Sequence, residues 1–372
     1  MRRTSPAAVF HRAGVPFELR EYPLPDPEPG AILVRLRLAN VCGSDLHQWR
    51  GEGGSPIPEG GRVLGHEMVG DVERLGAGVD TDSMGRPLRV GDRVAYPYFL
   101  PCRRCPACTS GRFGTCARRL AHYREPAGRF PYFNGGFAGH YYLRPGHFVF
   151  RVPERLPDSA VAPANCALAQ VVHGFDVAGF RLGQAVVIQG AGALGLYAAA
   201  LADAAGARRV VVIDALPSRL ELARRLGAHD VISVAETSRE ERVERVRELT
   251  GGGAELVLEL AGSPQVVGEG LEMVAGGGTY LDMGLLGDFT VELRPASLLR
   301  RNVRYVGANH YEPIALARGL DFLERSLDRY PFDDMVTEVF PLERIEDAFR
   351  RADWAAAEPE RAPVGRVGLR VP

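Results

Sequence analysis

The stretch A-V-V-I-Q-G-A-G-A-L-G, residues 185–195, decides the fold of the second half of the chain. Its first five residues form a short apolar run that is typical of a buried parallel strand. The glycines after it allow a tight turn, the close approach of a pyrophosphate, and the packing of a helix on the strand. The small residues that follow predict a helix whose N-terminus can bind phosphate. The stretch therefore predicts a dinucleotide-binding unit, with Gly190, Gly192, Leu194 and Gly195 as its candidate loop residues.

A second strand, Val210–Ile213, follows this helix and ends at Asp214. An acidic residue at this offset is the expected partner of the adenosine ribose. A 2′-phosphate there would meet a negative charge, and Ala215 stands where an NADP enzyme would more often place arginine. The pattern therefore predicts NAD rather than NADP.

The pattern of alternating strands and helices continues beyond Asp214. Further strands are predicted at 256–260, 279–283 and 303–307. Two capping boxes, Ser218 with Glu221 and Ser238 with Glu241, predict the starts of two helices. Together these elements predict a doubly wound parallel sheet of six strands.

The first part of the chain has a different texture. Ala31–Leu38 alternates apolar and charged residues, Val63–Val72 is another apolar run, and residues 90–95 read as a turn and a strand. These short strands and their long connections predict a compact β-barrel. After the α/β part, a helix at Pro313–Ser326 and a strand, helix and strand over 336–371 suit a return to this first part.

Length and composition exclude several classes of protein. A chain of 372 residues suggests about two domains. The net charge of -1 does not favour nucleic acid or an anionic membrane as a partner. The sequence has no apolar run of about eighteen residues and no secretory signal. We therefore expect a cytoplasmic protein, in which six reduced cysteines are metal ligands rather than disulfides.

Four of the cysteines have the spacing C-x2-C-x2-C-x7-C. Four thiolates within fifteen residues can close a tetrahedron around a structural zinc ion. Disulfides at this spacing would be strained, and an iron–sulfur cluster usually has its fourth cysteine closer. The predicted ligands of the structural zinc are Cys102, Cys105, Cys108 and Cys116.

The other two cysteines predict a second metal site. The stretch V-C-G-S-D-L-H, residues 41–47, offers Cys42, and V-L-G-H-E, residues 63–67, offers His66. A catalytic zinc keeps three protein ligands and an open fourth position. Cys166, in P-A-N-C at the start of the α/β part, is the natural third ligand. The alternative interpretation of Cys42 and His66 is a buried cysteine and a core histidine.

In combination, these motifs resemble the zinc-dependent medium-chain alcohol dehydrogenase family, from about Gly30 to the C-terminus. The resemblance implies a GroES-like catalytic domain over 1–163, with a structural zinc lobe at about 100–118. It implies an inserted Rossmann NAD-binding domain over 164–308, and a segment over 309–372 that returns to the catalytic domain. Family members often have glutamate where Cys166 stands, especially the polyol dehydrogenases.

The resemblance also implies roles for single residues. Cys42, His66 and Cys166 would hold the catalytic zinc, with Glu67 beside it and Asp45 orienting His66. Ser44 and His47 would form a proton relay. Tyr98 aligns with a position that lines the alcohol pocket, and Arg219 would contact the adenosine ribose. The alternatives are a turn hydroxyl for Ser44 and a surface imidazole for His47.

The expected activity is reversible hydride transfer between a primary or secondary alcohol and NAD, which gives an aldehyde or ketone. The expected cofactors are two zinc ions per chain and NAD, and the expected assembly is a homodimer or homotetramer. One alternative is a polyol or cyclitol dehydrogenase of the same superfamily. Two others are an NAD- and zinc-binding protein without catalysis and a nucleic-acid-binding zinc protein, which the neutral charge disfavours.

Overall fold

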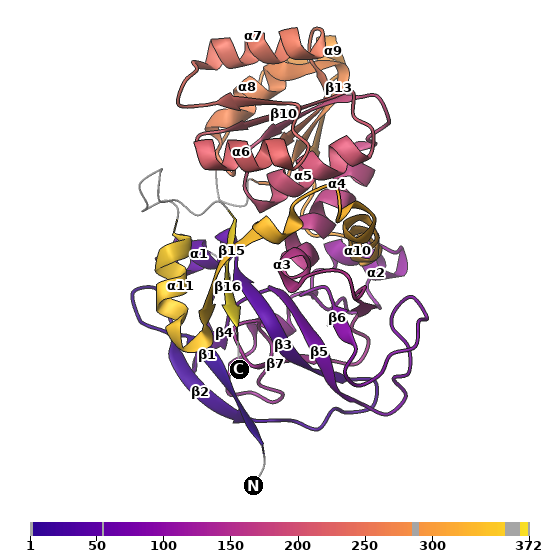
Figure 1. The fold of residues 1–372 in the computed structure, drawn as a ribbon, viewed down its shortest axis with the longest axis vertical. Helices are drawn as coiled ribbons and strands as arrows, with labels where there is room; N and C mark the ends of the chain where they lie inside the picture. The colour runs from indigo at the N-terminus through magenta and orange to yellow at the C-terminus, as the bar shows by residue number, and fades with distance from the viewer. Residues whose placement is uncertain (1–2, 54–55, 285–289, 354–364, 371–372) are drawn as a thin grey trace. The chain divides into compact units, whose positions relative to one another are not determined.

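The computed structural model describes residues 3–53, 56–284, 290–353 and 365–370. The chain separates into two compact units, and each is made of segments that are distant in sequence. Unit 1 holds Met1–Cys166, Glu312–Glu324 and Asp333–Pro372, and unit 2 holds Ala167–Tyr311 and Arg325–Phe332. In Figure 1 the yellow C-terminal elements of unit 1 accordingly lie among its indigo N-terminal strands.

Unit 1 is built on two sheets. Its smaller, antiparallel sheet has the order β2-β1-β4, with bounds Glu18–Pro23, Thr4–Phe10 and Arg62–Val63. Its larger sheet has the order β15-β16-β3-β5-β6-β8, with β7 also paired to β3. The bounds are β15 Val336–Pro341, β16 Arg366–Arg370, β3 Ile32–Val41, β5 Glu67–Leu75, β6 Arg93–Ala95, β8 Phe150–Arg151 and β7 His140–Leu143. The first segment is therefore the barrel-like β structure that its alternating runs predict.

The helices of unit 1 are short except for the one at Ile314–Ser326, and they connect its strands along the chain. They are α1 Gly43–Arg50, α2 Pro106–Thr109, α3 Asp158–Val161, most of α10 Ile314–Ser326, and α11 Ile345–Ala352. Phe349 of α11 contacts Phe17 and Phe137, with ring centroids 4.9 and 5.5 Å away. The last helix of the chain thus completes the core that the first strands begin.

Unit 2 is a six-stranded parallel sheet in the order β11-β10-β9-β12-β13-β14. The bounds are β11 Asp230–Ser233, β10 Arg209–Asp214, β9 Ala185–Gln189, β12 Ala254–Glu259, β13 Val274–Asp282 and β14 Arg304–Gly307. The central strands β9 and β12 are almost wholly buried, as near-continuous apolar runs require. The predicted doubly wound sheet is confirmed, and β11 is the one strand that the sequence pattern did not locate.

The helices of unit 2 alternate with its strands along the chain, and the first of them precedes β9. They are α4 Ala169–Ala178, α5 Ala193–Ala204, α6 Pro217–Arg225, α7 Arg239–Thr250, α8 Gln265–Met273 and α9 Pro295–Arg301. The capping box of α7 forms as predicted, because Ser238 and Glu241 each accept a hydrogen bond from the other's backbone N–H. The capping box predicted at Ser218 and Glu221 is wrong. Leu216 is the N-cap of α6 and Pro217 is its first residue, so Ser218 already lies inside the first turn.

The return to unit 1 is interrupted by one segment. Arg325–Phe332 groups with unit 2, although 309–372 was predicted to return as a whole. Asp203 at the end of α5 explains this, because its Oδ2 accepts hydrogen bonds from Arg329 and Tyr330 at 2.6 and 2.7 Å. No helix in the described part of the chain is both long and apolar enough to cross a bilayer.

Candidate functional site

Four ligand-type side chains converge in the interior of unit 1. One side-chain donor atom from each of Cys42, His66, Glu67 and Cys166 lies within 4.8 Å of all the others, and all four residues are buried. Strand pairing brings the first three together, because Asn40 at the end of β3 is in register with Glu67 at the start of β5. Cys42 then begins α1 as its N-cap, and His66 immediately precedes β5.

Asp45 contacts two members of this cluster from the first turn of α1. Its Oδ2 accepts the backbone N–H of Cys42 at 3.0 Å, and its Oδ1 lies 3.4 Å from His66 Nδ1. Burial lowers the pKa of His66, but the charges of Asp45 and Cys42 outweigh burial and leave it well above its usual value. The contact is the one expected of a residue that orients a metal-binding histidine.

Arg366 of β16 is a member of the site that the motifs did not reveal. Its guanidinium binds Glu67 through two hydrogen bonds, Nη2 to Oε1 at 2.8 Å and Nε to Oε2 at 3.0 Å. Its Nη2 also lies 3.3 Å from Cys42 Sγ. The signal that could have found it is an arginine inside the apolar closing strand V-G-R-V-G-L-R-V.

The charges of the cluster influence one another. The pKa of the Cys42 thiol lies well below its usual value, because Cys166 donates a hydrogen bond to it and Arg366 and His66 place positive charge nearby. Burial raises the pKa of Glu67 to about 8, and the guanidinium of Arg366 offsets part of this rise. Cys42 is thus held close to the thiolate form, which is the form that binds metals.

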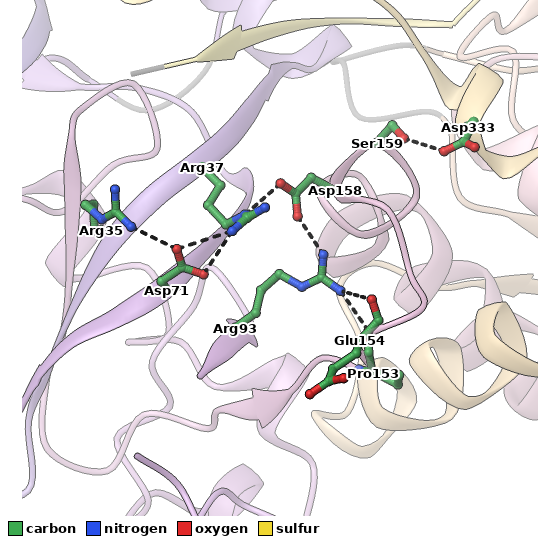
Figure 2. A network of polar contacts seen from close by, with 9 residues as sticks. All are labelled: Arg35, Arg37, Asp71, Arg93, Pro153, Glu154, Asp158, Ser159 and Asp333. Atoms are coloured by element: carbon green, nitrogen blue, oxygen red, sulfur yellow. Dashed lines mark hydrogen bonds and ion pairs between the residues drawn. The ribbon is translucent and has the colours of Figure 1, made fainter. Parts of the chain in front are cut away.

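A network of ion pairs positions the segment that carries Cys166 (Figure 2). Asp158, the first residue of α3, binds Arg37 of β3 at 2.7 Å and Arg93 of β6 at 2.9 Å. Arg93 also donates to the carbonyl of Pro153 at 2.7 Å. The π-helical turn Ala164–Leu168, which contains Cys166, begins three residues after α3. These bonds therefore hold in place the backbone that leads to Cys166.

The four cysteines of the predicted structural site form a second cluster. One Sγ atom from each of Cys102, Cys105, Cys108 and Cys116 lies within 4.8 Å of the others, and all four are free of disulfides. Cys105 Sγ lies 3.5 Å from Cys108 Sγ and 3.9 Å from Cys116 Sγ. Tetrahedral ligands about 2.3 Å from a zinc ion would be about 3.8 Å apart. The spacing of the thiols therefore suits a closed zinc site.

The two residues of the expected relay have different surroundings. Ser44 Oγ lies 3.4 Å from His66 Nε2, so this hydroxyl faces the buried cluster. His47 Nδ1 instead lies 2.6 Å from Glu52 Oε2, and 58% of its side chain is exposed. The ring of Tyr98 is 5.0 Å from the ring of His66, which places Tyr98 beside the cluster.

The glycine loop of unit 2 has the geometry that its sequence predicts. A Cβ atom on Gly195 would lie 1.9 Å from the carbonyl oxygen of Gly190, so only glycine fits there. Gly190 has a φ of 102°, and Gly192 has open space where a side chain would stand. Leu194 lies beside these glycines in the first turn of α5. A pyrophosphate can approach such a loop closely.

Asp214 ends β10 next to this loop. Its Oδ2 accepts the backbone N–H of Ala191 at 2.6 Å, and its Oδ1 accepts that of Leu216 at 2.9 Å. The carboxylate is thus held in a fixed orientation between the glycine loop and α6. Arg219 lies five residues further on, in the first turn of α6.

Two family models match the chain. Residues 28–154 match the alcohol dehydrogenase GroES-like domain, and residues 193–325 match the zinc-binding dehydrogenase domain. A 5-exo-hydroxycamphor dehydrogenase of Pseudomonas putida is 37% identical over 89% of this chain and 91% of its own. A D-xylulose reductase A of Aspergillus niger is 31% identical over 91% of this chain and 90% of its own.

Solved structures with the same fold cover the chain from end to end. An alcohol dehydrogenase from Thermotoga maritima has a TM-score of 0.91 and 29% identity, with all of both chains covered. A putative zinc-binding dehydrogenase from Sinorhizobium meliloti, solved with NADP bound, has a TM-score of 0.83 and 26% identity. It covers 99% of this chain and 100% of its own. The chain therefore belongs to the medium-chain dehydrogenase/reductase family, as a zinc-type alcohol or polyol dehydrogenase that acts on CH–OH donors.

Proposed function

We propose that this protein is a zinc- and NAD-dependent alcohol dehydrogenase, which reversibly oxidises a primary or secondary alcohol to an aldehyde or ketone. The observation that carries the proposal is the buried convergence of Cys42, His66 and Cys166, with the Ser44 hydroxyl facing it. Two thiols and an imidazole form the donor set of a catalytic zinc with an open fourth position. Cys102, Cys105, Cys108 and Cys116 would hold a second, structural zinc.

The residues around the proposed zinc site have separate roles in the reaction. A catalytic zinc lowers the pKa of a hydroxyl group bound to it. Asp45 fixes the orientation of His66, and Arg366 holds the Glu67 carboxylate next to the cluster. In the proposed relay the Ser44 hydroxyl takes up the proton of the substrate hydroxyl and gives up its own toward His47, whose largely exposed side chain releases a proton to solvent.

Zinc content and turnover test the assignment of the two sites. We expect two zinc ions per chain of metal-replete protein. Cys42→Ser should abolish turnover and leave a folded protein with one zinc, because the substitution removes a ligand from the catalytic site and leaves the four-cysteine site intact. Cys105→Ser should instead lower the thermal stability, because a closed zinc site contributes folding energy. One zinc per chain in the wild-type protein contradicts the proposal.

Cofactor choice is a separate proposal that rests on Asp214. A 2′-phosphate carries about two negative charges. At about 4 Å and an effective dielectric of about 20, each unit pair with Asp214 would cost about 4 kcal/mol before screening. A third of the sum over both phosphate charges would already disfavour NADP by roughly two orders of magnitude. Arg219, in the first turn of α6, is compatible with the ribose of NAD as well, so it does not overturn the assignment that rests on Asp214.

The test is kcat/KM for NAD and NADP, in the wild type and in two variants. Asp214→Ala should shift the preference toward NADP. Asp214→Asn keeps an oxygen that can accept the N–H of Ala191 or Leu216, so it separates the charge of Asp214 from its support of the loop. A wild-type preference for NADP would refute the assignment of NAD.

The substrate is proposed only as a class. Similarity to a D-xylulose reductase keeps a polyol dehydrogenase as the second candidate, whereas Cys166 favours a simpler alcohol. A panel of primary, secondary and cyclic alcohols and of sugar alcohols, followed by the absorbance of reduced nicotinamide, separates the two. Absence of turnover with every member would favour a binding protein without catalysis. We further propose a cytoplasmic homodimer or homotetramer, without nucleic acid or a membrane as partner.

A further inference from the structure

At the C-terminus of α1 the backbone turns back toward the last turn of the helix. Gly51 has a φ of 79°, and its N–H bonds to the carbonyl of Gln48 at 3.1 Å. The N–H of Glu52 bonds to the carbonyl of His47 at 2.8 Å. This pair of bonds is the Schellman arrangement, in which a left-handed glycine reverses the chain. It places the backbone of Glu52 directly beside His47.

The side chain of Glu52 uses this position. Its Oε2 lies 2.6 Å from His47 Nδ1, the short distance of a charge-assisted hydrogen bond. Arg50 Nη1 lies 3.5 Å from the same oxygen, and Arg50 is itself ion-paired with Asp353. Among the residues that the structure describes, Glu52 contacts the imidazole directly, Arg50 lies beside Glu52, and Asp353 lies beside Arg50.

A neutral imidazole carries one donor and one acceptor nitrogen, and the bond made by one nitrogen fixes the role of the other. A carboxylate that accepts from Nδ1–H leaves Nε2 with a free lone pair. We propose that Glu52 is a positioning residue, which holds His47 in the Nδ1–H tautomer so that Nε2 can accept the proton leaving the active site. This inference rests on the proposed relay through Ser44 and His47.

The chain contains a matched control for this pair. His11 Nε2 lies 2.8 Å from Glu18 Oε2. His11 directly follows β1 and Glu18 begins β2, and both side chains are partly exposed like those of His47 and Glu52. Glu18 has no part in either metal cluster. Glu52→Ala and Glu18→Ala therefore both remove a contact between a histidine and a carboxylate, with and without a connection to the relay, and Glu18→Ala also removes two hydrogen bonds from Arg20.

The first measurement is the tautomer of His47. The sample is zinc-loaded protein with 15N-labelled histidine and without nicotinamide. It is examined by long-range proton–nitrogen correlation NMR at a pH at which the imidazoles are neutral. The signal is assigned by its loss in His47→Gln. We expect His47 to be the Nδ1–H tautomer in the wild type and in Glu18→Ala, and to become a mixture of tautomers in Glu52→Ala. An Nε2–H tautomer in the wild type, or an unchanged signal in Glu52→Ala, overturns the inference whether or not the protein turns over alcohols.

The second measurement is alcohol oxidation. We expect Glu52→Ala to lower kcat by roughly 3- to 10-fold, less than the about 10²–10⁴-fold that a general base contributes, while KM changes little. In a His47→Gln background the same substitution should cause no further loss. Glu18→Ala should match the wild type. An unchanged kcat in Glu52→Ala, or a full additional loss in the double variant, contradicts the positioning role. Inactivity of the wild type with every alcohol would instead count against the proposed function, and the tautomer would still decide the role of Glu52.

Discussion

Arg366 and Glu67 form a buried ion pair whose contribution to stability requires both partners. The Glu67 side chain is fully buried and that of Arg366 is 15% exposed. Transfer of both charges into the interior is costly, and two hydrogen bonds with good geometry offset the cost. Removal of Glu67 leaves the guanidinium without its partner, and removal of Arg366 leaves Glu67 with the full cost of the burial that already raises its pKa.

We therefore expect Arg366→Met to lower the free energy of unfolding by about 3–5 kcal/mol. Urea denaturation of zinc-loaded protein measures the loss. Arg370→Met is the matched control, because Arg370 ends the same strand and is exposed, and it should stay within about 0.5 kcal/mol of the wild type. The double variant Glu67→Gln/Arg366→Met should recover part of the loss. Equal effects of the two single arginine variants would show that the buried pair is not the cause.

At the scale of the element, the capping box predicted for α6 is wrong and the one predicted for α7 is confirmed. Both helices carry serine followed three residues later by glutamate. In α7 this pattern coincides with the N-cap, whereas in α6 proline fixes the start one residue before the serine. A proline at the first helical position is well suited to begin a helix, and this local rule outweighs the serine pattern.

Ser238→Ala should therefore lower the free energy of unfolding by about 1 kcal/mol, because the N–H of Glu241 loses its acceptor. Ser218→Ala, the equivalent change in the other helix, should stay within about 0.5 kcal/mol of the wild type. Denaturation curves of the two variants under one set of conditions compare them directly. A loss at Ser218 as large as that at Ser238 would mean that α6 does not begin at Pro217 in solution.

At the scale of the whole molecule, the sequence predicted most of what local patterns encode. Runs of apolar residues located five of the six strands of unit 2, and the cysteines and His66 that the motifs single out lie close together in two clusters. Arg366 and Glu52 were not found, because their partners are chosen by strand pairing and by a helix end rather than by a motif. The assignment of Arg325–Phe332 to unit 2 likewise depends on Asp203, more than a hundred residues away in sequence.

The two units should also respond differently to acid. His140 and His147 lie in unit 1, and burial lowers their pKa values to about 4 and about 3. The ordinary pKa is about 6.5, so the unfolded chain binds more protons than the folded one below that pH. The contribution of these two histidines to the stability of unit 1 is thus complete above pH 6.5 and decreases as the pH falls toward 4.

Hydrogen exchange, corrected for the intrinsic effect of pH, should show protection in unit 1 falling before that in unit 2. His140→Gln cannot take up the proton at that position and should show a shallower decrease. Zinc loss in acid affects the wild type and the variant alike, so zinc is measured in both at each pH. Identical slopes for the two proteins would remove His140 from the explanation.

The pairing of β16 with β3 determines when unit 1 can finish folding during synthesis of the chain. β3 ends at residue 41, but its neighbour in the sheet begins at residue 366, and Arg366 reaches Cys42 and Glu67 from there. At about 5–20 residues per second, a ribosome needs roughly 2–8 s to make the last forty residues, Asp333–Pro372. All of unit 2 has been translated before that interval begins. The part of unit 1 that is made first is therefore finished last, because the cluster around Cys42 and Glu67 gains Arg366 only after β16 has been made.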